Sequence, residues 1–199
     1  RRVIHRTGFR IAGVDLSGQR LEEARRQAGE RGHDIEWHHG PRQELTASVP
    51  GSFDLVLCLG NSIPHLLTAN DLEAAFEQFD RILEPGGHLV LQLLNYERIL
   101  QQNARIVSVD RAGPREFIRF YDFLPVLVRF NLLTITWEKE EARHDLQSTE
   151  LYPYREPELR KSLVEQGFQN VEAFGGLAFQ DYDPAQSVTV LLTARKATE

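Results

Sequence analysis

The sequence predicts an α/β fold, in which helices join parallel strands, and three observations support it. An apolar run of strand length begins at Phe53 and stops at the Gly60-Asn61-Ser62 turn, where glycine lets the backbone approach a ligand closely. One helix later, the Pro85-Gly86-Gly87 turn leads into a second apolar run of the same kind. Two such strands with a crossover helix between them run parallel. Ligands of such sheets bind at the carboxyl ends of the strands, and four residues fall there: Asn61, Ser62, Pro64 and His65.

The elements before this unit also alternate between strand and helix. Residues 9–15 have an alternating apolar pattern and end on an acid, which is typical of a strand. Ser17 is then placed to cap a charged amphipathic helix over residues 19–30. A short strand over residues 35–39 leads to the Gly40-Pro41-Arg42 turn. This order of strand, helix and strand continues the α/β pattern.

The character of the chain changes after Asn95. Before it, apolar residues at helical spacing predict a helix over residues 70–83. After it, residues 117–121 and 126–137 are rich in β-branched and aromatic side chains, with no helix signal between them. We therefore expect a single domain over residues 1–199, with residues 115–155 as an inserted antiparallel β lid or substrate subdomain.

The C-terminal part returns to the α/β pattern. A helix over residues 156–166 ends at Gly167, and strands follow near residues 171–174 and 187–194. The loop between these strands carries Asp181 and Asp183, but no further residue completes a metal-ligand set there. We therefore predict no metal site.

Composition and charge narrow the function. The chain has 199 residues, 41% of them apolar, which is enough for one sizeable core. A formal net charge of -6 without a basic block argues against a nucleic-acid partner and favours a small-molecule substrate. The single cysteine, Cys58, lies in an apolar strand and is expected to be a buried thiol. No apolar run is long enough to cross a membrane, so we expect a cytoplasmic protein without a membrane partner and leave its oligomeric state open.

Four segments together carry a family resemblance: LGNSIPHL at residues 59–66, PGGHLV at 85–90, NYERIL at 95–100 and LYPY at 151–154. They resemble the class I S-adenosylmethionine-dependent methyltransferases, and more narrowly the glycine/sarcosine N-methyltransferase family. The resemblance implies a Rossmann-like sheet of seven strands with the last strand antiparallel, and it implies S-adenosyl-L-methionine as cofactor. The glycine-rich loop that follows the first strand in this family, and that strand itself, do not occur in these 199 residues.

The resemblance also assigns cofactor-binding residues by position. Asp15 would accept hydrogen bonds from both ribose hydroxyls, because a carboxylate offers two acceptor oxygens. Leu16 follows it at the same site. Pro41 and Arg42 would flank the adenine, and the Leu59-Gly60 pair would pass beneath the methionine part of the cofactor. Arg42 is equally compatible with a surface position, and Asp15 with a role as a helix cap.

A second set of residues would contact the methyl acceptor. Asn61 would point its amide toward the substrate, His65 would lie beside it, and Tyr121 and Tyr152 match pocket aromatics of the family. His65, Tyr121 and Tyr152 are the candidate catalytic residues, because an amine nucleophile must lose its proton before it attacks the sulfonium methyl. Each of the three is also compatible with a purely structural role.

One departure from the family changes the expected substrate. Leu94 stands where the glycine-methylating enzymes carry an arginine that pairs with the carboxylate of the amino acid. The sequence therefore predicts N- or O-methylation of a small molecule other than glycine. Two alternatives remain: a non-catalytic domain with a methyltransferase-like fold, and a nicotinamide-dependent oxidoreductase, whose fold also has an acid at the end of its second strand.

Overall fold

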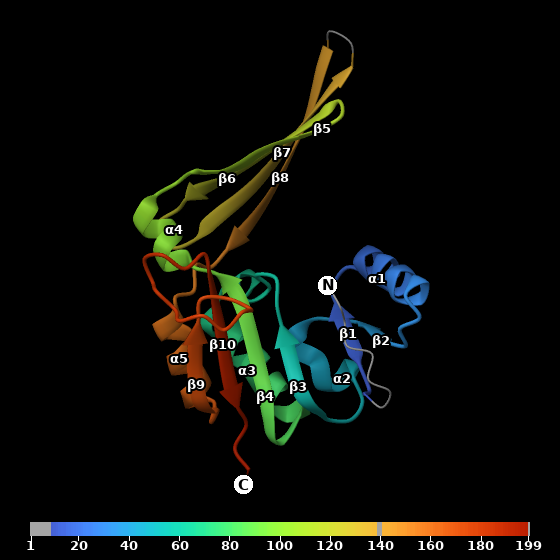
Figure 1. Ribbon diagram of the computed structural model, residues 1–199, viewed down its shortest axis with the longest axis vertical. Helices are drawn as coiled ribbons and strands as arrows, with labels where there is room; N and C mark the ends of the chain where they lie inside the picture. Colours follow the sequence, from blue (N-terminus) through green and yellow to red (C-terminus); the bar gives the residue numbers. More distant parts are fainter. Residues whose placement is uncertain (1–8, 139–140, 199) are drawn as a thin grey trace.

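The computed structural model describes residues 9–138 and 141–198, and it consists of a layered α/β body with a long antiparallel sheet projecting from it (Figure 1). The body is built on a four-stranded sheet in the order β3-β4-β10-β9. Its strands are β3 (Phe53–Cys58), β4 (Leu83–Leu94), β9 (Gln169–Phe174) and β10 (Thr189–Arg195). β3 and β4 are parallel, as expected for two strands joined by a crossover helix. β10, the last strand, is antiparallel to both of its neighbours.

A separate two-stranded parallel sheet precedes this body sheet along the chain. It consists of β1 (Ala12–Asp15) and β2 (Glu36–His39), with helix α1 (Gly18–Glu30) between them. The side chain of Ser17 caps α1 by accepting a hydrogen bond from the backbone of Arg20 at 3.3 Å, as its position in the sequence predicts.

The expected continuous sheet of seven strands does not form from the described residues. The strands of the body divide into sheets of two and four because no described strand pairs with β1 and β3 together. One consequence is visible on β3, where Leu55 is 49% and Leu57 57% exposed. Leucines on a parallel strand are normally covered on both faces, so one face of β3 is uncovered in the described part of the chain.

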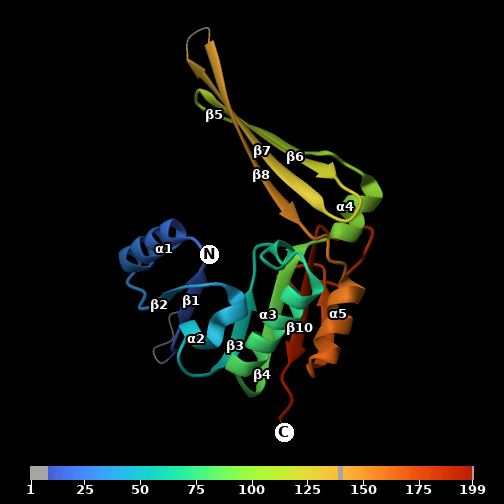
Figure 2. The ribbon, with the colours of Figure 1, turned by 180° about the vertical axis from the view of Figure 1, so that it is seen from behind.

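Two helices cover the other side of the body sheet (Figure 2). Helix α3 (Ala69–Ile82) begins at Thr68, whose hydroxyl accepts a hydrogen bond from the backbone of Asp71 at 3.1 Å. Its buried residues recur at helical spacing and pack in the same core as β4: Leu72, Ala75, Phe76, Phe79 and Ile82. Helix α5 (Glu156–Glu165) adds Leu159 and Leu163 to this core. Each leucine, isoleucine or phenylalanine side chain among them stabilises the fold by about 1.5–3 kcal/mol when it is fully buried.

Short elements complete the body. They are the 3-10 helices η1 (Arg42–Glu44) and η2 (Ile63–His65) and the helices α2 (Leu45–Ser48) and α4 (Tyr96–Gln102). Helix α4 has no counterpart in the elements expected from the sequence. It begins at Asn95, whose side chain accepts a hydrogen bond from the backbone of Arg98 at 3.3 Å. In the described part of the chain, no helix is long and apolar enough to cross a membrane.

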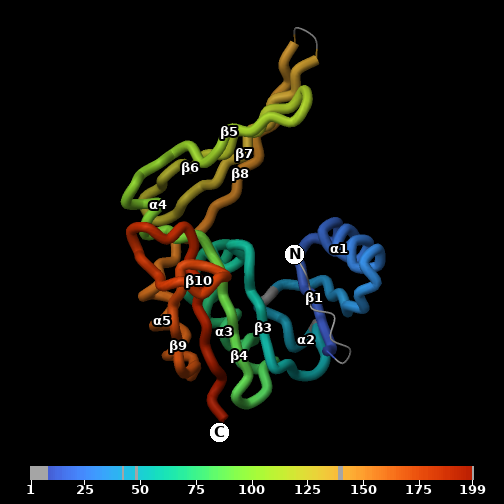
Figure 3. Tube along the Cα trace, in the orientation of Figure 1, coloured from blue at the N-terminus to red at the C-terminus, as the bar shows by residue number. Residues whose placement is uncertain are grey.

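The projecting sheet, which we call the arm, comprises residues 106–138 and 141–151 of the described chain. Its strands pair antiparallel in chain order: β5 (Ile106–Ala112), β6 (Arg115–Phe123), β7 (Val128–Glu138) and β8 (Glu141–Leu151). The aromatic and β-branched segments predicted to be antiparallel strands fall in β6 and β7. The trace shows the arm leaving the body next to α4 and reaching well beyond it (Figure 3). β5 lies before residue 115, where the predicted insertion starts, and it pairs with β6 from Ile106 to Ala112.

Candidate functional site

The loop after β3 has an unusual backbone. Gly60 and Asn61 both adopt left-handed conformations, with φ of 76° and 63°. Glycine takes this conformation without strain, and asparagine tolerates it better than most residues. The loop is tied to β4, because the backbone N–H of Gly60 donates to Gln92 Oε1 at 2.8 Å and that of Asn61 donates to the Gln92 carbonyl at 3.2 Å. The strand ends of β3 and β4 are thereby held together.

The side chain of Asn61 makes a second connection. Its Nδ2 donates to the hydroxyl of Tyr96 at 2.9 Å, and its Oδ1 accepts from the backbone N–H of Leu94 at 3.0 Å. Tyr96 is fully buried, and this burial is the main reason why the pKa of its phenol lies far above the ordinary value. The hydroxyl of Tyr96 therefore stays protonated and acts as a neutral hydrogen-bonding group. The amide of Asn61 holds the loop in place.

Tyr96 was not singled out by the sequence. In the sequence, the dipeptide Asn95-Tyr96 only marks the point where the α/β pattern ends, and it is part of one of the segments that resemble the methyltransferase family. A buried tyrosine with a bonded hydroxyl has the same sequence signature as any apolar residue facing the core. Its position one residue after a helix-capping asparagine is the one signal that points to it.

Tyr121 reaches the same region from the arm. It lies on β6, is 4% exposed, and packs against Phe130 with the ring centroids 5.8 Å apart. Burial raises the pKa of its phenol, and its proximity adds to the rise in the pKa of Tyr96. No hydrogen bond to the Tyr121 hydroxyl occurs among the described residues. Tyr121 and Asn61 thus both lie close to Tyr96.

Tyr152 and His65 lie where the end of the arm meets η2. The backbone N–H of Tyr152 donates to the carbonyl of Pro64 at 2.8 Å, which fastens the end of the arm to η2. The Tyr152 hydroxyl is 3.4 Å from Glu158 Oε1, and its ring lies 4.4 Å from that of Tyr154. His65 is the last residue of η2 and is exposed. Tyr121 and Tyr152 thus both lie near the loop after β3. Their expected contacts with a substrate stay predictions.

The predicted cofactor residues occupy two strand ends. Asp15 ends β1, and β1 and β3 point the same way, so that Asp15 and Gly60 lie at the same end of the body (Figure 1). Asp15 is half-buried, and its Oδ1 accepts from the backbone of Ser17 at 2.8 Å. In the described part of the chain, its other oxygen has no partner. The ring Nε2 of His39 lies 2.8 Å from the carbonyl of Leu16 and holds this turn against β2.

The remaining predicted residues lie around these strand ends. Leu16 is 58% and Leu59 37% exposed, so both present apolar surface to solvent. Pro41 precedes η1 and is half-buried. Arg42 starts η1, and its side chain lies outside the described residues.

These positions are compatible with an S-adenosyl cofactor. One carboxylate oxygen of Asp15 is available for the ribose hydroxyls, which is the chemistry expected of that residue. At Gly60 no atom lies within 4 Å of the place where a Cβ would be, so the backbone there is open to a ligand. In the described residues, no group of three or more His, Cys, Asp or Glu is placed to hold a metal ion.

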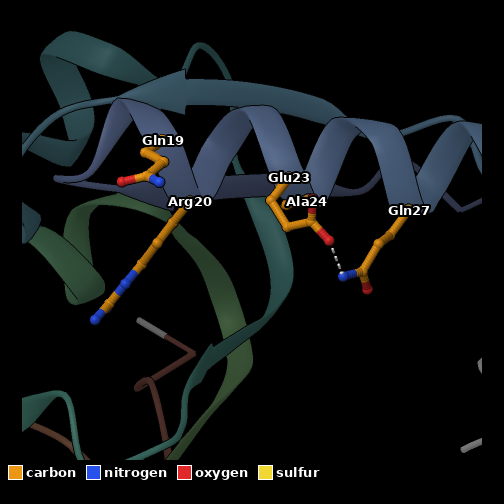
Figure 4. A pocket seen from close by; sticks show the side chains of 5 residues that line it. All are labelled: Gln19, Arg20, Glu23, Ala24 and Gln27. Atoms are coloured by element: carbon orange, nitrogen blue, oxygen red, sulfur yellow. Dashed lines mark hydrogen bonds between the residues drawn. The ribbon is translucent and has the colours of Figure 1, made fainter. Parts of the chain in front are cut away.

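A hollow on the surface is formed by α1 alone. It is lined by Gln19, Arg20, Glu23, Ala24 and Gln27, all from α1 (Figure 4). Gln27 donates to Glu23 within it at 2.6 Å. One exposed helix face with mainly polar side chains does not enclose a small molecule. We therefore place the candidate site at the strand ends rather than on α1.

The chain is similar to known methyltransferases. Residues 1–87 match the protein family described as methyltransferase domain. The chain is 27% identical over 180 residues to a glycine/sarcosine N-methyltransferase of Halorhodospira halochloris, covering 89% of this chain and 65% of that protein. It is 26% identical to the enzyme of the same name from Aphanothece halophytica, over 84% of this chain and 61% of that protein. The chain thus spans less than two thirds of the length of these curated relatives.

Solved structures show the same fold. A S-adenosylmethionine-dependent methyltransferase from Clostridium acetobutylicum superposes with a TM-score of 0.82 at 17% identity, covering 95% of this chain and 76% of that one. The sugar N-methyltransferase KedS8 from Streptoalloteichus gives a TM-score of 0.70 at 19% identity, covering 94% and 70%. The similarity covers the arm as well as the body, because nearly the whole chain is aligned.

Proposed function

We propose that this chain is a class I S-adenosylmethionine-dependent methyltransferase that methylates a nitrogen or oxygen atom of a small-molecule acceptor; its similarity to methyltransferases in fold and in sequence supports this proposal. The resemblance to methyltransferases favours this reading over the nicotinamide-dependent oxidoreductase. The open strand ends at Asp15 and Gly60 favour it over a domain that has lost its cofactor site.

The cofactor would lie across the carboxyl ends of β1 and β3. Asp15 would accept hydrogen bonds from the ribose, and the exposed Leu16 and Leu59 would offer apolar surface to the rest of the molecule. Pro41 and Arg42 are proposed to flank the adenine. When bound, the cofactor supplies an electrophilic methyl group. The protein then has to align the acceptor and exclude water.

The acceptor would lie between the loop after β3 and the end of the arm that joins the body. The connection from Asn61 to Tyr96, with Tyr121 beside it, is the observation that carries this proposal, because it brings three separate elements together at one strand end. Tyr152 and His65 would line the opposite side. His65 is exposed and is the candidate for accepting a proton from an amine nucleophile.

The acceptor is proposed to lack a free carboxylate at the position of Leu94. The Leu94 side chain packs against the apolar core, and its backbone N–H already donates to Asn61. Neither group can bind an anion there. A structural neighbour is named as a sugar N-methyltransferase, and an amino sugar is an acceptor of the kind that this site would suit.

Equilibrium binding of S-adenosylhomocysteine to the full-length protein tests the cofactor part of the proposal. Asp15→Ala should weaken binding by about 1.5–3 kcal/mol, the scale of hydrogen bonds to a charged group. Asp34→Ala, which removes an exposed acid before β2, is the matched control and should leave the affinity unchanged. Equal affinities of wild type and Asp15→Ala by calorimetry would remove Asp15 from the site.

A further inference from the structure

The arm has one apolar face. The strand register places residues that pair across β5, β6, β7 and β8 on the same side of the sheet. One side collects apolar residues along most of the arm's length. Six of them lie away from the body: Val109, Ile118, Leu133, Ile135, Trp137 and Leu146.

The opposite face has a different character. Near the body, Tyr121, Val128 and Leu151 point from it into the protein and are buried. Farther out it carries polar side chains such as Arg119 and Gln147, together with the half-buried Phe117 and Leu132. The more strongly exposed apolar side chains of the projecting part, Val109, Trp137 and Leu146, thus lie on the first face, which we call the apolar face.

Nothing in the described part of the chain covers the apolar face. Val109 is 65%, Leu146 53% and Trp137 41% exposed, and the arm's main contacts outside itself are between β8 and η2 at the body. A contiguous apolar patch on a projecting sheet is unfavourable in water and is typical of an interaction surface. The apolar face is therefore the candidate interaction surface of the arm.

Both edge strands of the arm carry charged residues. β5 carries Asp110 and Arg111, and β8 carries Glu141, Arg143, Asp145 and Glu150. Charged residues on an edge strand oppose pairing with another chain. A partner would therefore pack on the apolar face.

The charges around this face identify the kind of partner. Three arginines lie at its borders, and each forms an ion pair with an acid of the arm. The pairs are Arg105–Asp122 at 2.5 Å, Arg129–Glu150 at 2.9 Å and Arg111–Glu116 at 3.6 Å. Among the described residues the face is thus neutral, whereas the whole chain has a formal net charge of -6. A second acidic copy can approach this surface without repulsion.

We propose that the apolar face of the arm packs against the same face of a second copy of this chain. Four strands about 4.8 Å apart, with about nine residues per strand, give a face of roughly 500 Å². Two such faces bury roughly 1,000 Å² in total, which reaches the size expected of a specific interface. Trp137 and Phe120 supply the large aromatic side chains that dominate the energy of such contacts.

Sedimentation equilibrium of the full-length protein over a concentration series tests this proposal. The wild-type protein should be a dimer. Leu146→Glu should weaken dimerisation by roughly a hundredfold or more, because each dimer would then bury two unpaired carboxylates. Gln147→Glu places the same charge on the neighbouring residue of the opposite face and should leave the dimer intact. The mass is measured without cofactor or acceptor, so the result does not depend on methyl transfer.

A second pair of measurements covers the case in which Leu146→Glu does not fold. Val109→Glu, on β5, should have the same effect. Dilution of the wild-type dimer should increase quenching of Trp137 by acrylamide, and Trp137→Phe should abolish the change, since Trp37 is the only other tryptophan. A monomeric wild type, or a dimer that folded Leu146→Glu and Val109→Glu leave unchanged, would overturn the proposal.

Discussion

The amide of Asn61 donates from Nδ2 to the hydroxyl of Tyr96 at 2.9 Å, and this single bond joins the end of β3 to the first turn of α4. Asn61 also accepts from the backbone N–H of Leu94 through Oδ1, so its amide joins the loop after β3 to the end of β4 and the start of α4. The left-handed backbone of Asn61 directs its side chain toward these two residues.

Removing either partner should destabilise the protein. Tyr96→Phe leaves the Asn61 amide without its acceptor; because Asn61 is half-buried, the cost should lie near the low end of the range of about 1–3 kcal/mol for a buried group. Asn61→Gly keeps the left-handed backbone and removes the amide. The two variants together should show a coupling of about 0.5–3 kcal/mol in a double-mutant cycle followed by urea unfolding.

A matched control is available for this cycle. Asn103 is also left-handed, with φ of 49°, and its side chain makes no hydrogen bond among the described residues. Asn103→Gly should therefore change the free energy of unfolding by no more than about 0.5 kcal/mol. Strict additivity of Asn61→Gly and Tyr96→Phe would show that the bond contributes nothing.

Glycine should be a poor substrate. The apolar side chain of Leu94 packs against the core and offers no cation to a carboxylate. Methyl transfer to glycine or sarcosine should be negligible, while an amino sugar without a carboxylate is the comparison acceptor. A radiolabelled methyl assay measures both. Glycine turnover near 1 per second, within the ordinary range of enzymes, would contradict the proposed acceptor class.

The two candidate tyrosines should affect the acceptor more than the cofactor. Tyr121→Phe or Tyr152→Phe should lower kcat/KM for the acceptor by about tenfold, equivalent to about 1.4 kcal/mol of transition-state stabilisation. The affinity for S-adenosylhomocysteine should stay the same, because neither residue lies at the end of β1.

Tyr154→Phe separates this effect from a structural one. The hydroxyl of Tyr154 donates to the Leu66 carbonyl at 2.8 Å, so its loss should reduce stability by about 1 kcal/mol. It should not lower kcat/KM by the same factor. If all three tyrosine variants have the same kinetics, Tyr121 and Tyr152 are packing residues only.

Alkaline pH should weaken the fold partly through Tyr182. Burial raises the pKa of Tyr182 from 10.0 to about 12, and nearby acids including Glu97 add to the rise. The folded state therefore binds this proton more tightly than the unfolded state does. Its contribution to stability is fully present below pH 10 and is lost as the pH rises toward 12. Urea unfolding between these pH values should show a shallower decline for Tyr182→Phe than for wild type. Parallel pH profiles would contradict this assignment.

The sequence predicts the elements whose patterns are strong. The apolar run after Phe53, the helix that contains Phe76 and Phe79, and the aromatic strands of the arm all form near their expected positions. Their periodicity reflects burial, which the fold needs in any case. β5 was missed because most of its residues are exposed and its pattern is weak.

The site is less well predicted, because contact between distant residues leaves little trace in the sequence. Asn61 is correctly placed after β3, but its amide is engaged by Tyr96 and Leu94. Only the fold brings these groups together. The separation of β1 and β2 from the body sheet was likewise not predicted. Which strands pair depends on contacts between distant segments, and the local apolar pattern of a strand does not reveal its partner.

The arm leaves and rejoins the body at the same end of its sheet. The backbone of Tyr121 donates to the carbonyl of Arg105 just before β5, while Leu151, at the other end of the arm, pairs with Val128 at the start of β7. An insertion that is joined to the body at one end only can be lengthened, shortened or replaced at its far end without moving the strands of the body. Variation in sequence and length can therefore accumulate in the arm while the strands of the body stay the same. Chimaeras with junctions near residues 105 and 151 are a practical route to altered specificity.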